Sequence, residues 1–359
     1  MSDVRARQTP TADPGLLAAY TTLGLGGPSR RLSTAVTEDE IVQSVRQAAL
    51  LGQPVLILSG GSNVVIADAG FPGTTVLVRS RGLRVVAESA DTVTIRVEAG
   101  EPWDGVVAAA VANGWSGVEG LSGIPGATGA TPIQNVGAYG QEVAETVTAV
   151  RVYDRATDEI VTKPATECGF AYRSSIFRHS DRWVVLSVDF TLARSPLSAP
   201  VRYVELARAL GVQVGDRVPL PDARAAVLAL RAGKGMVLDP ADPDTRSVGS
   251  FFTNPVLDAP AFALLRERAG ELGEPPSWPG ADGTVKISAA WLIDKAGFSK
   301  GYGGTGGVAI SSKHTLALTN RGSGSTASLL ALAREIRDGV HQRFGVILRP
   351  EPVLIGCDL

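Results

Sequence analysis

The stretch GLSGIPGATGATPIQNVGAYG, Gly120–Gly140, decides how the rest of this chain is interpreted. Its first five glycines cannot build a packed core by themselves, and each glycine costs backbone entropy on folding. The interleaved Ile124, Ile133 and Val136 are expected to be buried, which argues against a long disordered loop. The stretch therefore predicts a surface whose backbone closely approaches a flat or phosphorylated ligand.

Two other glycine-rich stretches differ in what they indicate. SGGSN, Ser59–Asn63, follows the apolar run PVLIL, and such a turn lets consecutive backbone N–H groups converge on an anion. A Gly-Gly turn after a strand is more often only a turn, so this feature alone is weak evidence for an anion site.

GYGGTG, Gly301–Gly306, fits the dinucleotide fingerprint, but a helix precedes it and a strand follows it. The fingerprint requires the reverse order, so we interpret this stretch as a loop and exclude a Rossmann site.

Composition narrows the class of protein. The chain has 359 residues and a net charge of −2, which fits two or three domains with a large core and does not favour nucleic-acid or membrane-surface binding. Its two cysteines, Cys168 and Cys357, are far apart, so we expect neither a disulfide scaffold nor a metal site. The N-terminus is polar and no apolar run is long enough to span a membrane. We expect a cytoplasmic protein.

From Val76 onward, short strands are joined by turns and a small helix, which predicts a strand-rich α+β region. A helix is expected over Glu38–Leu51, with Thr37 as its N-cap. Residues 195–219 are expected to form an inserted loop with a short helix. The predicted organisation is a disordered leader (1–15), two consecutive regions (16–80 and 81–218), a third region (219–345) and a terminal strand (346–359).

Three side chains stand out for their chemistry. Ser250 lies in SVGSFFTNP, which is not a G-x-S-x-G elbow, and the chain has only three histidines. A hydrolase nucleophile is therefore disfavoured, although this serine could still donate a proton. Arg173 lies among apolar and aromatic residues, where an arginine requires an anionic partner. Glu351 lies between two prolines in the expected terminal strand. Taken singly, each charged residue could equally form a surface ion pair.

Together these stretches resemble the UDP-N-acetylenolpyruvoylglucosamine reductase family, flavoenzymes that complete UDP-N-acetylmuramate in peptidoglycan synthesis. The matching segments run in the family's order from Tyr20 to Gly356: YTTLGLGG, ILSGGSNVVIAD, the glycine-rich stretch extended by QEV, FAYRSSIFR, RAGKGMVLDP, GSFFTNPV, DGTVKISAAWLIDKAGFSKG and LRPEPVLIG. The resemblance implies a two-part FAD-binding region of the vanillyl-alcohol oxidase type, followed by a C-terminal α+β substrate-binding domain. It also implies NADPH as reductant and UDP-N-acetylglucosamine enolpyruvate as substrate, and we expect a monomer.

The resemblance assigns roles by matching segments. Ser250 corresponds to the proton donor, and Arg173 and Glu351 to residues that stabilise the intermediate; whether Glu351 acts protonated or through water stays open. The expected FAD contacts are Ser59, Gly60, Gly61, Ser62, Asn63, Gly123, Ile124, Pro125, Gly126, Ala127 and Gly129. The expected substrate contacts are Tyr139, Tyr203, Lys234, Asn254 and His314. Tyr203 lies in the loop that closes over the nucleotide sugar in the longer family subtype.

The alternation of a strand predicts which side chains of SVGSFFTNP share a face. Ser250, Phe252 and Asn254 would point to one side, where we expect flavin and substrate. Phe251 and Thr253 would turn the other way, toward the core.

Two other functions are compatible with these segments. One is a flavin oxidase of the same superfamily acting on a sugar or alcohol. Such enzymes often bind FAD covalently through a histidine or cysteine, and residues 52–140 contain neither, so we expect non-covalent FAD. The other is an inactive FAD-containing sensor of a sugar nucleotide, which is disfavoured because Ser250, Arg173 and Glu351 are all present.

Overall fold

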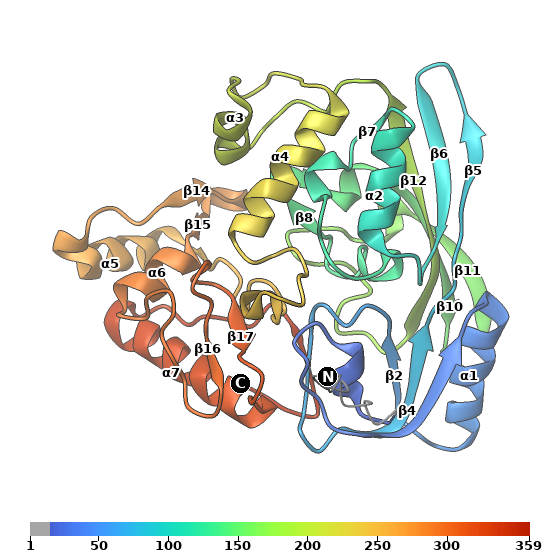
Figure 1. The fold of residues 1–359 in the computed structure, drawn as a ribbon, viewed down its shortest axis with the longest axis horizontal. Helices are drawn as coiled ribbons and strands as arrows, with labels where there is room; N and C mark the ends of the chain where they lie inside the picture. Colours follow the sequence, from blue (N-terminus) through green and yellow to red (C-terminus); the bar gives the residue numbers. More distant parts are fainter. Residues whose placement is uncertain (1–14) are drawn as a thin grey trace, which may run out of the picture.

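The structure is a computed structural model that describes residues 15–359 (Figure 1). Apart from Gly15, the expected leader lies outside the described residues. In Figure 1 the strand-rich first half, coloured blue to green, lies on one side, and the orange and red C-terminal helices lie on the other. Within residues 15–359, no helix is both long enough and apolar enough to cross a bilayer.

The largest sheet has six strands, in the order β11–β10–β12–β6–β5, with β7 pairing on β12. Its pairs are all antiparallel. In that order the strands are Glu159–Pro164, Val147–Asp154, Trp183–Arg194, Thr92–Glu98 and Leu83–Glu88, with β7 at Trp115–Ser116. Alternate residues of β6 are buried, as expected for a strand with one face on the core. Helix α2, Trp103–Ala112, packs against this sheet through Trp103, whose ring lies 5.4 Å from that of Phe190 in β12.

A smaller parallel sheet presents the first glycine turn. Its order is β1–β4–β2, and the strands are Ser29–Ala35, Phe71–Val78 and Val55–Leu58. Helix α1, Glu38–Leu50, packs against this sheet. Thr37 is its N-cap, because its hydroxyl accepts a hydrogen bond from the Glu40 amide at 3.2 Å, so the predicted helix start is confirmed. Strand β2 ends immediately before SGGSN, so the sheet holds that turn in place.

The C-terminal strand lies beside the segment that follows the SGGSN turn. Strand β3, Val64–Ile66, leaves the SGGSN turn and pairs in parallel with β18, Val353–Ile355. Glu351 therefore precedes the terminal strand, and the expectation that it lies within the strand is wrong. Pro352 directly before β18 has no amide hydrogen for a sheet ladder, which fits a strand that begins only at Val353.

The inserted loop carries a short helix, as expected. Helix α3, Val204–Leu210, packs on α4, Leu220–Gly233. Figure 1 shows both at one end of the molecule, α3 away from the large sheet. Val201, Leu206, Ala207 and Val227 form their own buried cluster, and Tyr139 from the glycine-rich stretch packs against it.

The remaining helices enclose a C-terminal core. They are α5 (Ala259–Ala269), α6 (Ala289–Lys295) and α7 (Thr326–Phe344), with strands β13 (Val256–Leu257), β14 (Ser277–Pro279), β15 (Val285–Ile287), β16 (Val308–Ile310) and β17 (Leu318–Asn320). The buried cluster also includes Leu23, Leu25 and Val65 from the start of the chain. The two ends of the chain therefore share one core.

The segment SVGSFFTNP is not the alternating strand that the sequence predicted. Ser250 and Phe252 form only isolated bridges, to Ala317 and Pro350. Phe251 and Phe252 are both buried, and their rings meet edge to face at 5.1 Å. The predicted alternation is wrong because the C-terminal core receives both rings, so apolar burial outweighs the period of a regular strand.

Candidate active site

One cleft of about 360 Å³ brings together segments from the whole chain. Its walls come from the SGGSN turn, the glycine-rich stretch and the loop between β11 and β12. The end of α4 and the segments around Ser250 and Glu351 complete the lining. The volume lies within the usual range for small-molecule pockets. Most of the expected site residues line it: Ser59, Gly60, Gly61, Ser62, Asn63, Ile124, Pro125, Gly126, Ala127, Arg173, Ser250 and Glu351.

The two glycine turns meet backbone to backbone at this cleft. A Cβ atom added at Gly60 would lie 2.5 Å from the Cα of Gly126, and one added at Gly126 would lie 2.5 Å from the Ser62 hydroxyl oxygen. That hydroxyl also donates to the Pro125 carbonyl at 3.0 Å. Glycine is required here because no side chain fits between the turns, so their backbones stay bare toward a ligand.

The cleft also concentrates polar atoms that have no partner in the protein. Five buried side-chain nitrogen or oxygen atoms of residues 15–359 lack a hydrogen bond. Four of them belong to residues that line this cleft: Trp103, Gln134, Arg178 and Arg231. Native proteins leave few buried polar groups unpaired, so this cluster indicates a bound polar ligand. A flavin with its polar ring edge and diphosphate fits such a lining.

Arg173 is held by several contacts at one wall of the cleft. Its Nε donates to Glu351 Oε1 at 3.1 Å, and its Nη2 donates to the Gly137 carbonyl at 2.8 Å. The Arg173 backbone has a φ of +52°, a conformation that non-glycine residues adopt only at a cost. The Arg178 side chain donates to the Arg173 carbonyl at 2.5 Å. The surroundings therefore impose this strained geometry and aim the guanidinium at the carboxyl group.

Burial raises the pKa of the Glu351 carboxyl above its usual range, while Arg173 and Arg178 oppose the increase. Desolvation disfavours the carboxylate more than the two cations favour it. The balance therefore shifts this carboxyl group toward its protonated form. Ser250 lines the same cleft, and its hydroxyl makes no hydrogen bond to another residue of the described chain.

The expected substrate residues form a second group beside the cleft. The rings of Tyr139 and Tyr203 meet edge to face at 5.5 Å, and Lys234 Nζ lies 5.6 Å from the centre of the Tyr139 ring. Lys234 also forms an ion pair of 2.6 Å with Glu205 of α3. Burial, with Lys234 and Lys300 nearby, lowers the pKa of His314 to about 4, so its imidazole is neutral at pH 7.

Three expected ligand contacts lie elsewhere. Asn254 does not line the cleft with Ser250; its Oδ1 accepts from the Ala289 amide at 3.0 Å, where α6 begins. Gly123 and Gly129 are also outside the lining. A Cβ at Gly123 would lie 2.8 Å from Leu228 Cδ2, and one at Gly129 would lie 2.6 Å from Ala99 Cβ. These two glycines allow close packing behind the cleft.

Trp103, Gln134, Arg178 and Arg231 all line the cleft, although none was expected there from the sequence. A cation among apolar residues, the feature that singled out Arg173, also occurs at Arg178 in SSIFR and at Arg231 in LALRAG. Trp103 and Gln134 carry no such signal in the sequence.

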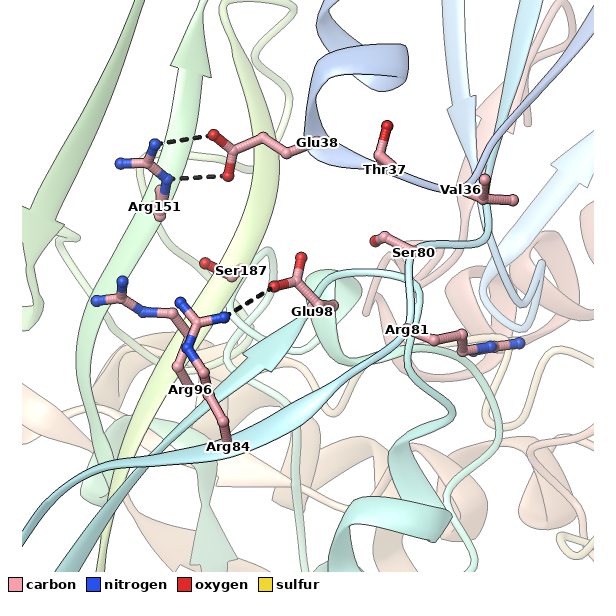
Figure 2. A pocket seen from close by; sticks show the side chains of 10 residues that line it. All are labelled: Val36, Thr37, Glu38, Ser80, Arg81, Arg84, Arg96, Glu98, Arg151 and Ser187. Atoms are coloured by element: carbon pink, nitrogen blue, oxygen red, sulfur yellow. Dashed lines mark hydrogen bonds and ion pairs between the residues drawn. The ribbon is translucent and has the colours of Figure 1, made fainter.

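A second pocket, of about 520 Å³, lies between the start of α1 and the large sheet (Figure 2). It is rich in arginine, and three of its four arginines pair with carboxylates, among them Arg96 with Asp189 at 2.7 Å. Figure 2 shows Arg151 paired with Glu38, at 2.8 Å, and Arg84 facing Glu98, at 3.8 Å. The pocket contains no expected site residue, and we interpret it as an ion-pair network that joins α1 to the sheet.

Fold and cleft together define the class: this is an FAD-binding oxidoreductase. Residues 30–163 match the family described as FAD binding domain, and residues 240–355 match the family described as UDP-N-acetylenolpyruvoylglucosamine reductase, C-terminal domain. The α+β fold with an FAD-binding region and a separate C-terminal domain is thereby confirmed.

Whole-chain relatives identify the family. The chain is 70% identical over 345 residues to the UDP-N-acetylenolpyruvoylglucosamine reductase of Salinispora arenicola (strain CNS-205), covering 96% of this chain and 95% of the relative. It is 58% identical over 358 residues to that of Thermobifida fusca (strain YX), covering 99% of each chain. The crystal structure of the enzyme from Thermus caldophilus superposes with a TM-score of 0.66 at 25% identity, covering 95% of this chain and 97% of the other. The chain belongs to the UDP-N-acetylenolpyruvoylglucosamine reductase family.

Proposed function

We propose that this chain reduces UDP-N-acetylglucosamine enolpyruvate to UDP-N-acetylmuramate, with FAD as cofactor and NADPH as reductant. The observation that supports this most is the convergence of Ser250, Arg173 and Glu351 on one cleft that two bare glycine turns also line. We further propose that the enzyme acts in the cytoplasm, since its substrate is a soluble sugar nucleotide, and that it is a monomer.

The residues of the cleft fit non-covalent FAD. The backbones of Gly60 and Gly126 can approach the cofactor, and the unpaired polar atoms of Trp103, Gln134 and Arg178 can bond to it. Neither histidine nor cysteine is among the described residues that line the cleft, so a covalent link has no attachment point. When bound, FAD supplies the hydride for the reduction, and NADPH renews it.

Arg173 binds the carboxylate of the enolpyruvyl group. Its guanidinium can make charge-assisted, bidentate bonds, and negative charge accumulates on that carboxylate as the double bond is reduced. The Gly137 carbonyl and Glu351 hold the guanidinium before substrate arrives, so little reorganisation is needed during the reaction.

Glu351, the partner of Arg173, also binds the carboxylate of the enolpyruvyl group. Burial raises its pKa, and a carboxyl group that carries a proton can donate a hydrogen bond to a substrate oxygen. A protonated carboxyl also adds no negative charge beside the substrate.

Ser250 donates the proton that completes the reduction. A serine hydroxyl is a weak acid, so it serves only when a much more basic carbanion lies within hydrogen-bond reach. Its hydroxyl is not bonded to another described residue and lines the cleft. Donation from Oγ to the carbon beside the carboxylate fits this position.

The UDP end of the substrate lies between the inserted loop and α4. Lys234 provides a positive charge there, and Tyr139 and Tyr203 provide flat surfaces and hydroxyl groups. Neutral His314 can hydrogen-bond without adding charge.

The test uses purified protein. An absorbance scan should show flavin, and acid precipitation without proteolysis should release it. NADPH should be oxidised rapidly only when UDP-N-acetylglucosamine enolpyruvate is present. Flavin that stays attached after acid treatment would point to an oxidase, and bound FAD and substrate without turnover would point to a sensor. Either result would refute the proposal.

A further inference from the structure

Arg231 is a buried cation for which the protein supplies no counter-ion. It lies near the end of α4, is only 8% exposed and lines the cleft. Its Nη2 donates to the Met236 carbonyl at 3.0 Å, and its Nε has no hydrogen-bond partner. Within residues 15–359 no carboxylate forms an ion pair with it.

Two other cations of the site have carboxylate partners, whereas Arg178, which also lines the cleft, forms no ion pair within residues 15–359. Arg173 contacts Glu351, and Lys234, three residues after Arg231, contacts Glu205. Tyr139 and Asp104 are the acidic groups that act on Arg231; Asp104 is the only carboxylate of the two, and both of its oxygens bind Arg224, at 2.7 and 2.8 Å. The positive charge of Arg231 is therefore left for something outside the protein.

Arg231 cannot remove its unpaired positive charge by losing a proton. Burial lowers the pKa of Arg231, yet arginine stays protonated in proteins. A buried, unpaired charge is strongly unfavourable. The side chain nevertheless reaches the cleft beside the glycine-rich stretch: a Cβ at Gly123 would lie 3.5 Å from Arg231 Cδ, which is ordinary van der Waals contact.

We propose that Arg231 is the counter-charge for the negative charge that the FAD ring carries after two-electron reduction. This inference rests on the proposed function of the cleft. The position favours the flavin over the substrate diphosphate, because Arg231 shares its cleft with the two glycine turns and Ser250. Lys234, Tyr139 and Tyr203, at the proposed UDP end, do not line that cleft.

The test is the two-electron reduction potential of FAD in the purified holoenzyme. Arg231→Met removes the charge and keeps much of the volume, so the potential should become more negative by about 30 mV or more, a tenfold change in the reduction equilibrium. Arg231→Lys keeps the charge and should restore most of the shift. The matched control is Arg208→Met on the neighbouring helix α3; because Arg208 is exposed and does not line the cleft, this variant should retain the wild-type potential.

A flavin-loaded Arg231→Met variant with unchanged potential would overturn the inference. So would a variant that keeps its potential but no longer binds UDP, because Arg231 would then serve the diphosphate. If Arg231→Met does not retain flavin, the inference is tested by the absorption spectrum of reduced flavin in the wild-type protein. Its reduced flavin should keep the anionic absorption spectrum at pH values where free reduced FAD is already protonated, and a neutral spectrum there would refute the idea. Absence of flavin from the wild-type protein would instead refute the proposed function.

Discussion

Arg173 Nε lies 3.1 Å from Glu351 Oε1 and joins residues that are 178 positions apart in the chain. One partner follows the glycine-rich stretch, and the other lies two residues before the last strand, β18. Each side chain restrains the other: the carboxyl group helps hold a guanidinium on a strained backbone, and the guanidinium limits the increase in the carboxyl pKa. Because the pair acts as a unit, the effects of substituting both should not be additive.

The first prediction concerns stability and pH. The pKa of Glu351 is raised in the folded protein, so the folded state binds this proton more tightly than the unfolded chain does. Where the folded state holds more protons, the free energy of unfolding falls as pH rises. Between the ordinary glutamate value and the raised one, ligand-free wild type should therefore lose stability relative to Glu351→Gln. Denaturant titrations of both proteins over a pH series measure this difference.

Other titrating groups are common to both proteins and cancel in that comparison. Above the raised pKa the difference should become constant. A difference that grows in favour of wild type as pH rises would mean that Arg173 lowers the pKa of Glu351 overall.

The second prediction separates a role in catalysis from a role in folding for Arg173. Arg173→Ala should retain FAD, because the glycine turns and other cleft residues remain. Turnover of the enolpyruvyl substrate should fall by about 10²-fold or more, since the stabilisation of developing charge is lost. Flavin absorbance and steady-state kinetics check both statements. Loss of bound flavin would assign Arg173 a structural role instead.

The third prediction concerns Ser250. Ser250→Ala should leave reduction of the flavin by NADPH nearly unchanged and slow reoxidation by the enolpyruvyl substrate by about 10²–10⁴-fold. Stopped-flow measurements resolve the two half-reactions. Thr253→Ala, which removes a nearby hydroxyl that does not line the cleft, is the control and should resemble wild type. Equal slowing of both half-reactions by Ser250→Ala would exclude the proton-donor role.

The fourth prediction concerns the pair between Lys234 and Glu205, whose atoms lie 2.6 Å apart. A substrate diphosphate must compete with Glu205 for this ammonium group. Lys234→Met should therefore raise the KM for the UDP substrate, whereas Glu205→Gln should lower it. Binding of UDP alone, followed by calorimetry, should change in the same directions. A higher KM in Glu205→Gln would show that Glu205 orders the loop instead of competing with the substrate.

The fifth prediction uses the two glycine turns. Gly60→Ala should reduce FAD content strongly, because its Cβ would lie 2.5 Å from the Gly126 backbone. The matched control is Gly105→Ala in helix α2, where no other atom lies within 4 Å of the added Cβ. That substitution should keep full flavin content and raise stability by about 0.5–1 kcal/mol, since alanine favours helices. Equal flavin content in both variants would show that the turns can separate.

Part of the fold could be predicted from local patterns. The α1 helix and its cap at Thr37, the short helix in the inserted loop and the absence of a Rossmann unit at GYGGTG all depend on nearby residues. The segment around Ser250 could not be predicted, because Phe251 and Phe252 are buried by partners from distant parts of the chain. Glu351 was placed in a strand for a similar reason: the pairing of β18 with β3 sets where that strand begins.

The sequence by itself determined the family, the cofactor and the residue types available for chemistry. Glycine turns and unusual charged residues lie in short segments, so they can be recognised without knowledge of the fold. Only the tertiary structure decided which of these residues meet. It placed Arg173 against Glu351, moved Asn254 to the start of α6 and left Arg231 buried without a counter-ion. The physical reason is that burial and pairing of charge depend on contacts between distant segments, which no short pattern encodes.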